Sequence, residues 1–336
     1  MLRFLILRIS SAVPVLFVLS VVTFAIIQAP PGDYSDYIRS QLINMGGASF
    51  DQADAQAKAY AVEHGLDKPI PVQYVNWIAG MVTRGDFGDS MYYNRPVSEI
   101  VAERLPRTIL LALTCHIFAS LFGITFGILA ATKQYSWVDT ALSGISFLGM
   151  TIPRFLMALV LVYFLVFHYD MNEIGNFFSP KYGGAPWSWA KFADLVHHVW
   201  PVVAIATFGG LAYNMRVMRG NLLDTLNAQY VETARAKGLP ESAVIMRHAV
   251  PNALHPLIMY QGVVLPYMLT GEIEVAIIFA LPTVGPAIVT SMNVGDVYVT
   301  ATFMLVLAAT LIIGNIIADI LLALLDPRIR LGGSRA

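Results

Sequence analysis

The sequence has 336 residues, of which 57% are hydrophobic and only 13% are charged, and its formal net charge is -1. A soluble domain usually carries about 25% charged residues, so this composition is typical of a membrane protein. The balanced charge gives no sign of the basic surface that binds nucleic acid, and we expect no nucleic-acid partner. The single cysteine, Cys115, excludes an internal disulfide and a thiolate metal cluster.

The N-terminal stretch predicts a membrane anchor that is retained. After Arg3 and Arg8, residues 9–32 carry no charge. This run is longer than the apolar part of a secretory signal peptide, and no A-x-A cleavage site closes it. We therefore expect residues 1–31 to form a cytoplasmic N-terminus and a first transmembrane helix.

Six apolar runs predict six transmembrane helices, because a helix needs about 20 mostly apolar residues to cross the hydrocarbon core. The runs lie roughly at residues 9–29, 108–132, 141–167, 197–215, 255–278 and 298–325. The predicted fold class is an all-α polytopic membrane protein. A polar region, residues 32–107, separates the first two helices and is long enough for a small folded element outside the membrane. Residues 108–336 would form the core with helices two to six.

The positions of lysine and arginine predict the orientation, because cationic residues in short loops resist translocation. With the N-terminus in the cytoplasm, the inner side holds eleven such residues: Arg3, Arg8, Lys133, Arg216, Arg219, Arg235, Lys237, Arg247, Arg328, Arg330 and Arg335. The short outer loops hold only two, Lys181 and Lys191. We therefore expect both termini to lie in the cytoplasm.

Residues 216–254 lie between predicted helices four and five, and this segment is too polar to be a membrane span. Leu226, Tyr230, Val231 and Ala234 recur at helical spacing, which predicts a short amphipathic helix over about residues 222–237. Gly238 can take a positive φ and end that helix. Pro240 suits the first turn of a second helix, with Glu241 complementing its dipole, and Pro251 should stop or kink it. The pattern predicts two helices that meet at a glycine corner.

Part of this segment resembles the EAA loop of ABC importer permeases, through Glu232, Thr233, Ala234 and Gly238, with Pro251 thirteen residues further on. Thr233 replaces the first alanine of the family pattern, and His248 stands where an aliphatic residue is usual. In the family, this loop is the coupling helix that docks into a groove of the ATPase subunit. The resemblance assigns the coupling role to six residues: Tyr230, Glu232, Ala234, Arg235, Gly238 and Pro251. The alternative is an amphipathic helix that lies on the membrane surface.

Further matches along the whole chain resemble the permeases of the dipeptide, oligopeptide, nickel and opine importers, and within them the first, B-type, permease subunit. They include Pro31, Gly32 and Asp33, then Gly85 and Asp86 in the polar region, and the C-terminal run from Leu325 to Arg330. The sequence departs from the family at Tyr34, where proline is frequent, and at residues 281–285, LPTVG in place of PGLG. These departures leave the substrate open between oligopeptides, which are the default, and oligosaccharides, opines or metal chelates.

The resemblance implies an assembly in a bacterial inner membrane. This chain would pair with a second homologous permease subunit to form the translocation pathway. Two cytoplasmic ABC ATPase subunits would bind ATP and Mg²⁺ and supply the energy, and a periplasmic or extracellular substrate-binding protein would deliver the cargo. No GxxxxGK[ST], GxSxG or HExxH motif occurs in the sequence. We therefore expect no enzyme activity, catalytic residue, cofactor or metal site in this chain.

Several ionisable residues fall in or near predicted spans, where a charge normally faces a cavity or a partner. Glu272 and Glu274 follow Gly271 in predicted helix five, which lines the pathway in this family, so we assign these three residues to the pathway. Arg154 follows Pro153, which predicts a kinked helix with the guanidinium against an interface or a backbone carbonyl. Gly123 and Gly127 at GxxxG spacing predict close helix packing.

Two other classes of protein remain as alternatives. A secondary transporter that works without ATPases would need two related halves with broken helices or a coupling-ion site, and the sequence shows no such symmetry. A membrane scaffold without transport activity would not need the segment of residues 216–254.

Overall fold

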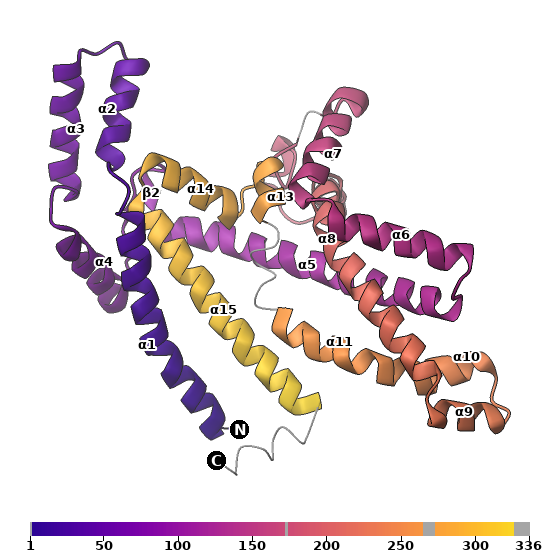
Figure 1. Ribbon diagram of the computed structural model, residues 1–336. Coiled ribbons are helices and arrows are strands. Elements are labelled where there is room, and N and C mark those ends of the chain that lie inside the picture. Colours follow the sequence, from indigo (N-terminus) through magenta and orange to yellow (C-terminus); the bar gives the residue numbers. More distant parts are fainter. Residues whose placement is uncertain (1, 172–173, 265–272, 326–336) are drawn as a thin grey trace. The chain divides into compact units, whose positions relative to one another are not determined.

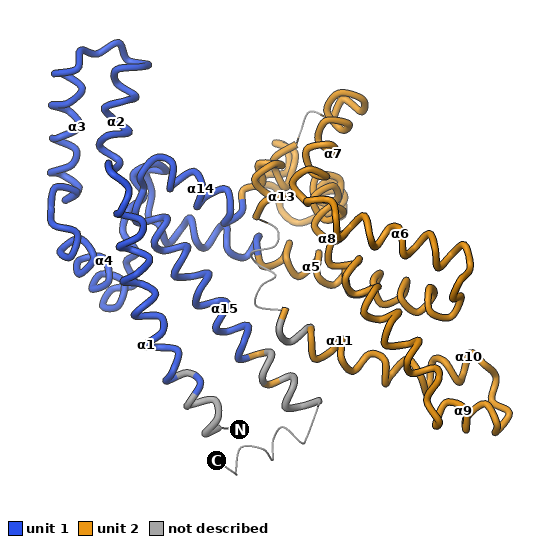
Figure 2. Tube along the Cα trace, viewed as in Figure 1, with its two compact units in different colours: residues 1–108, 283–316 blue, residues 109–282, 317–336 orange. Residues whose placement is uncertain are grey.

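The computed structural model describes residues 2–171, 174–264 and 273–325 (Figure 1). Nearly all of its regular structure is helical, which confirms the predicted all-α class. The only strands among the described residues are a pair of two residues each. The chain divides into two compact units, residues 1–108 with 283–316 and residues 109–282 with 317–336 (Figure 2).

Four helices among the described residues are long and apolar enough to cross a membrane. They are α1 (Leu2–Ile27), α5 (Val97–Thr132), α8 (Trp189–Leu226) and α15 (Val297–Leu325). Each contains or overlaps one of the predicted spans, namely the first, second, fourth and sixth. Because α5 and α8 have 36 and 38 residues, both extend well beyond the stretches that the apolar runs indicated.

The third predicted span, residues 141–167, is not one continuous helix, and its break lies where the sequence predicted a kink, beside Pro153. It consists of α6 (Trp137–Thr151) and α7 (Arg154–Tyr169), which are bent by 102° at the break. Proline disfavours the helical conformation of the residue before it, and Ile152 is accordingly extended, with ψ of 124°. Together the two helices could form one broken span, which would raise the number of spans among the described residues to five.

The fifth predicted span, residues 255–278, lies partly outside the described residues. Its beginning belongs to α11 (Val250–Val264) and its end to α13 (Ile273–Ile278). A further apolar helix, α14 (Val284–Val294), follows and ends at Gly295, which has a φ of 76°.

The predicted polar region contains the small folded element that its length suggested. It has three helices, α2 (Tyr34–Asn44), α3 (Phe50–His64) and α4 (Ile70–Arg84). Capping boxes at Asp33 and Ser49 begin α2 and α3, because these side chains bond the free backbone N–H groups of the first turn. The strands β1 (Asp89–Ser90) and β2 (Arg95–Pro96) then form a short antiparallel ribbon, with Ser90 opposite Arg95.

A buried carboxylate joins this ribbon to the start of α15. Asp296 is fully buried, and its Oδ2 accepts hydrogen bonds from Ser90 Oγ at 2.7 Å and from the backbone N of Tyr92 at 3.1 Å. Burial away from water raises the pKa of the Asp296 carboxyl above its ordinary value, although these hydrogen bonds oppose the rise. Around the junction, Val97 and Ile100 of α5 pack against Val299 and other apolar residues of α14 and α15.

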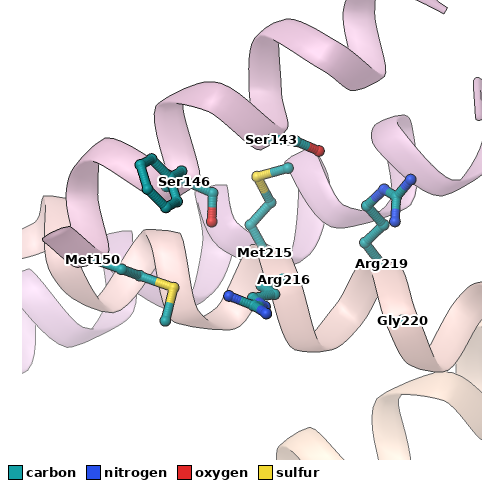
Figure 3. A pocket seen from close by; sticks show the side chains of 8 residues that line it. Ser143, Ser146, Met150, Met215, Arg216, Arg219 and Gly220 are labelled. Atoms are coloured by element: carbon teal, nitrogen blue, oxygen red, sulfur yellow. The ribbon is translucent and has the colours of Figure 1, made fainter. Parts of the chain in front are cut away.

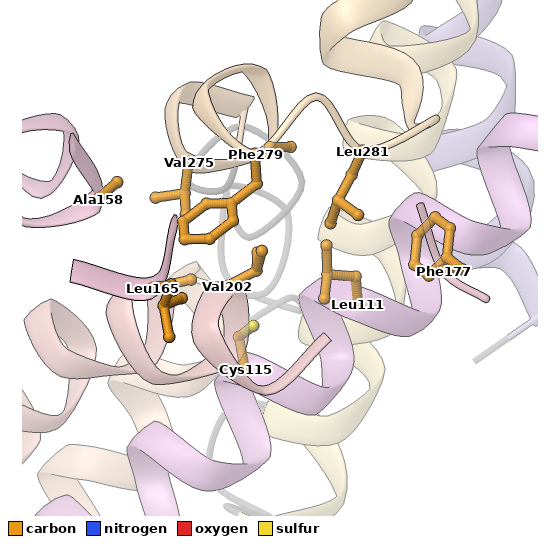
Figure 4. Close-up of a cluster of buried hydrophobic side chains, with 11 residues drawn as sticks. Leu111, Cys115, Ala158, Leu165, Phe177, Val202, Val275, Phe279 and Leu281 are labelled. Carbon is orange, nitrogen blue, oxygen red and sulfur yellow. The ribbon is translucent and has the colours of Figure 1, made fainter. Parts of the chain in front are cut away.

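The second unit has an apolar core built on α5, α7, α8 and α13. Figure 4 shows Cys115 and Val202 facing Phe279 within this cluster. The Gly123 and Gly127 pair confirms the predicted close packing. A Cβ added at Gly127 would lie 2.6 Å from the Cβ of Met218, and one at Gly123 would lie 2.6 Å from that of Asn214, so only glycine lets α5 and α8 approach this closely.

Candidate functional site

The corner segment, residues 216–254, begins in the last turns of α8 rather than in a separate helix. The predicted helix over residues 222–237 is wrong in its first half, because α8 continues to Leu226 and α9 runs only from Gln229 to Ala236. Ala228 between them is extended, with a ψ of 144°. The helical spacing of Leu222 and Leu226 therefore belongs to α8, and the amphipathic helix proper is the eight-residue α9.

Gly238 makes the predicted corner. Its φ of 75° lies in the left-handed region, and its N–H donates to the carbonyl of Arg235 at 2.9 Å. No heavy atom lies within 4 Å of a Cβ added at this position. The requirement for glycine is therefore conformational, because an L side chain disfavours this φ even where there is room for it.

Pro251 does not stop the helix that follows the corner, so of the two predicted effects, a stop or a kink, the stop is wrong. After Pro240, the chain continues through α10 (Glu241–Ala243) and the π-helical segment η2 (Val244–Ala249) into α11, whose second residue is Pro251. A proline inside a helix provides no N–H and crowds the carbonyl four residues before it. The wider π-helical turns directly before Pro251 accommodate that defect, and the Asn252 side chain donates to the His248 carbonyl at 2.9 Å.

One side of α9 is buried against the helices on either side of the corner. Val231 is fully buried and Ala234 is 6% exposed. They share an apolar cluster with Met218 and Leu222 of α8 and with Val244, Ala249, Val250, Ala253 and Leu257 beyond the corner. Burying a side chain of the size of Val231 contributes about 1.5–3 kcal/mol, so α9 is held to α8 and α11 by its apolar side.

The other side of α9 is exposed and carries the three other residues of this helix that were assigned to coupling. Tyr230 is 45% exposed, and Glu232 and Arg235 are also exposed. Beyond the corner, Leu239 and Met246 are exposed by 40% and 56%. The corner segment therefore presents a mixed polar and apolar surface on a short helix whose opposite side is fixed.

Arg235 braces the corner through its guanidinium. Its Nη2 and Nε donate to the carboxylate of Glu241 at 2.8 and 3.1 Å, and its Nη1 donates to the carbonyl of Leu226 at 3.2 Å. The hydrogen bonds from Arg235 lower the pKa of the Glu241 carboxyl, and the same pairing raises the pKa of Arg235. One side chain thus connects the end of α8, α9 and the start of α10, which the sequence pattern did not indicate.

Two further polar contacts fix the helices that carry the corner, and the sequence analysis missed both. Asn221 of α8 donates through its Nδ2 to the carbonyl of Ala253 at 3.2 Å and so ties α8 to α11. Arg219 makes two hydrogen bonds, of 2.7 and 2.8 Å, to the carboxylate of Asp139 at the start of α6. From the sequence, Arg219 was predicted only to be a cation of the inner side, because no local pattern identifies a partner eighty residues away.

A hollow next to this pair is lined by α6 and α8. Figure 3 shows Ser146 and Met150 of α6 on one side and Met215, Arg216 and Arg219 of α8 on the other. Its lining is mainly apolar, and the Ser146 hydroxyl already donates to the carbonyl of Ala212 at 2.7 Å. The arrangement offers packing space beside the first residues of the corner segment and no set of groups for bond chemistry.

The predicted pathway residues lie mostly beyond what the structure describes. Gly271 and Glu272 are outside the described residues. Glu274 is the second residue of α13 and is exposed, whereas its neighbours Val275 and Ala276 are buried in the core of the second unit. Their assignment to the pathway stays a prediction.

Arg154 is the last of the ionisable residues that the sequence places in or near a span. Arg154 begins α7 beside the break at Pro153, and a Cβ added to Gly209 of α8 would lie 2.9 Å from its Nε. The guanidinium therefore lies against the backbone of α8, as the sequence predicted for a kinked helix. No group of three or more His, Cys, Asp or Glu side chains arranged to hold a metal occurs in the described part of the chain.

Comparisons with known proteins show which family the chain belongs to. Residues 123–331 match the family model of the binding-protein-dependent transport system inner membrane component, and residues 1–112 match the model of the N-terminal part of such components. The oligopeptide transport system permease protein AppB of Bacillus subtilis is 36% identical over 98% of this chain and 99% of its own length. A protein of Brucella suis named as a peptide permease is 32% identical with the same coverage. A Sinorhizobium fredii protein named as a peptide ABC transporter permease is 30% identical over 96% of this chain and 97% of its own length.

These matches cover the corner segment and both compact units, and they agree with the resemblance that residues 230–251 first indicated. The chain belongs to the family of inner membrane components of binding-protein-dependent transport systems, which are the multi-pass permeases of ABC transporters.

Proposed function

We propose that this chain is the permease subunit of an ATP-driven importer that takes up oligopeptides and forms half of the translocation pathway. The family membership supports the permease role, and the names of the relatives support the substrate class. Oligosaccharides, opines and metal chelates remain alternative cargoes within the same architecture. The other half of the pathway would come from a second, homologous permease subunit.

The corner segment is the proposed attachment point for a cytoplasmic ATPase subunit. The observation that carries this proposal is the division of α9 into two sides, with Val231 and Ala234 buried and Tyr230, Glu232 and Arg235 exposed. A partner that binds the exposed side pushes on a helix whose other side is packed onto α8 and α11. Movement of the ATPases would therefore reach the membrane helices without a flexible joint between them.

The coupling needs contacts that differ between two states of the assembly, because a partner that binds both states equally shifts neither. ATP and Mg²⁺ would bind to two ATPase subunits, and their closure would draw the corner segments of the two permeases together. This would alternate the pathway between inward-open and outward-open states. Gly271, Glu272 and Glu274 are proposed to line that pathway, and a substrate-binding protein is proposed to deliver the peptide on the side opposite the ATPases.

Reconstitution of the whole importer in proteoliposomes tests the proposal. The substrate-binding protein is supplied on one side, ATP on the side of the ATPases, and uptake of a radiolabelled oligopeptide is measured. Glu232→Ala should greatly reduce uptake, because Glu232 is exposed on α9 and its loss removes a contact with the ATPase but no internal packing. Glu63→Ala is the matched control, since it removes an exposed glutamate from α3.

The outcomes separate the candidate functions. Uptake that persists without any ATPase would contradict the ABC importer and favour a secondary transporter. ATP-dependent uptake of an oligosaccharide, but not of peptides, would keep the mechanism and overturn the proposed cargo. Equal uptake by the Glu232→Ala and Glu63→Ala importers would remove the coupling role of Glu232.

A further inference from the structure

The helix α4 is apolar on both of its sides, which is unusual for a helix in a polar region. From Ile70 to Thr83 it contains no charged residue, and its only charge is Arg84 at the C-terminus. The inner side buries Gln73, Trp77 and Gly80. A helix that is apolar all round is normally buried in protein or in a membrane.

The outer side of α4 is an exposed apolar stripe. Val72, Val75, Ala79 and Val82 follow one another at helical spacing, and all four are exposed. The exposed fractions of the three valines are 43%, 57% and 76%. The neighbouring Thr83 hydroxyl is satisfied within the helix, because it donates to the carbonyl of Ala79 at 2.6 Å. Asn76 is also exposed and lies on this side of the helix, between Val72 and Ala79. Apart from Asn76, the stripe has few polar groups that require water.

Three contacts show at what depth α4 lies along the membrane-spanning helix α1. Tyr74 Oη and Ser20 Oγ are 2.8 Å apart, the rings of Trp77 and Phe24 stack at 5.5 Å, and Gln28 donates to Gln73 at 3.0 Å. Figure 1 shows α4 beside the C-terminal part of α1. Ser20 lies seven residues before the end of α1 at Ile27, so these contacts extend about 10 Å along the helix axis.

That depth places α4 in a leaflet rather than in the water beyond it. The hydrocarbon core is about 30 Å thick, so 10 Å from the end of a spanning helix still lies within one leaflet. The apolar window of α1, Ser10–Ile27, is only 11% buried, and Phe17 and Val21, which lie one turn before Ser20 and Phe24 on the same side of the helix, are exposed. The stripe on α4 therefore lies near apolar surface that α1 also exposes.

We propose that α4 is embedded in the membrane leaflet at the C-terminal end of α1, with Val72, Val75, Ala79 and Val82 in contact with phospholipid acyl chains. Arg84 ends the helix with its side chain 67% exposed and 3.6 Å from the Asp86 carboxylate, and a side chain of this length can extend its charge to the phosphate groups. α4 does not cross the membrane, since its 15 residues span only about 22 Å. It would anchor the hairpin of α2 and α3 to the bilayer surface.

Spin labels at single positions test this placement in the complete importer, reconstituted in nanodiscs of phosphatidylethanolamine and phosphatidylglycerol. Val75→Cys and Val82→Cys are labelled on the stripe, and Gln56→Cys, an exposed position of α3, is the matched control. All variants keep Cys115, whose buried thiol gives the background measured on the unsubstituted protein. Relaxation enhancement by oxygen, which concentrates in lipid, is compared with that by a water-soluble nickel chelate.

A lipid-embedded α4 requires the ratio of oxygen to nickel accessibility to be several-fold higher at both positions 75 and 82 than at position 56. Equal ratios at the three positions would mean that water covers the stripe and would overturn the proposal. Low accessibility to both reagents at positions 75 and 82 would mean that another protein subunit covers the stripe, which would overturn it as well. Two stripe positions keep the result interpretable if one variant does not assemble.

Discussion

Two junctions in this protein use charged side chains in opposite ways. In the corner segment, Arg235 and Glu241 pair at the surface, with side chains 40% and 55% exposed, while Val231 and Ala234 hold α9 in place. At the start of α15, the fully buried Asp296 itself holds the ribbon of β1 and β2. An exposed pair adds little stability, whereas a buried carboxylate with several hydrogen bonds is costly to remove. The comparison indicates that charges of the corner are available to a partner, and that the hydrogen-bonding carboxyl group of Asp296 serves the internal structure.

Asp296→Ala should have the largest effect on stability. The substitution leaves the buried Ser90 hydroxyl and the backbone N–H of Tyr92 without their acceptor, and a buried polar group that loses its partner costs about 1–3 kcal/mol. Thermal unfolding of the purified protein in detergent measures the loss, and Asp51→Ala at an exposed position of α3 is the control. A variant as stable as the control would mean that Asp296 is not the anchor of the ribbon.

Gly238→Val should come next, because it forces a branched side chain into the left-handed region at a cost of about 1–2 kcal/mol. Relief of that strain would reorient α9 relative to α10, so we expect transport to fall more than stability does. Gly238→Asn is the matched control, since asparagine tolerates positive φ. Both variants are compared in ATP-dependent uptake and in thermal unfolding. If valine and asparagine behave alike, the backbone conformation of the corner is irrelevant to coupling.

The pH dependence of stability should separate the two junctions more finely. The raised pKa of Asp296 means that the folded protein binds this proton more tightly than the unfolded chain. The stabilisation that comes from this tighter proton binding is therefore fully present below the pKa of an aspartate in the unfolded chain, about 3.9. It is lost as the pH rises through the pKa of Asp296 in the folded protein. The melting temperature of the wild type relative to Asp296→Asn should increase when the pH is lowered from about 8 to about 4.5. A constant difference over this range would contradict the effect of burial.

Glu241→Gln should have the smallest effect of the four. Glu241 has a lowered pKa, so its ion pair is present at neutral pH and weakens only in acid, opposite in sign to Asp296. Because the pair with Arg235 is exposed to solvent, we expect no measurable change in the melting temperature at neutral pH and a weaker dependence on salt than in the wild type. A clear drop in melting temperature would show that the pair, rather than apolar burial, holds the corner.

The sequence predicted those features that depend on local rules. The positive φ of Gly238, the apolar side formed by Val231 and Ala234, and the break at Pro153 follow from the conformational preferences of single residues and from helical periodicity. The prediction of a stop at Pro251 failed, because a π-helical segment directly before it accommodates the proline and the helix continues. The conformational preference of proline predicts that it destabilises a helix. It does not predict the π-helical turns before it that reduce this destabilisation.

Contacts between residues far apart in the chain could not be predicted from the sequence. The pairs of Arg219 with Asp139 and of Asn221 with Ala253 join segments that lie eighty and thirty-two residues apart. No local pattern predicts the burial of Asp296, because that burial depends on the ribbon and the start of α15 together. The same holds for α4. Its two apolar sides suggest contact with lipid only once its contacts with α1 show where it lies along that helix.

Protection of the exposed side of α9 by the ATPase tests the central claim most directly. Thr233→Cys places a thiol on that side, and Gln56→Cys places one on the exposed surface of α3. The rate of labelling by a water-soluble maleimide is measured on the permease with and without the ATPase subunits. We predict strong protection at position 233 and unchanged labelling at position 56. Equal labelling of position 233 in both samples would contradict the assignment of the corner segment as the ATPase attachment point.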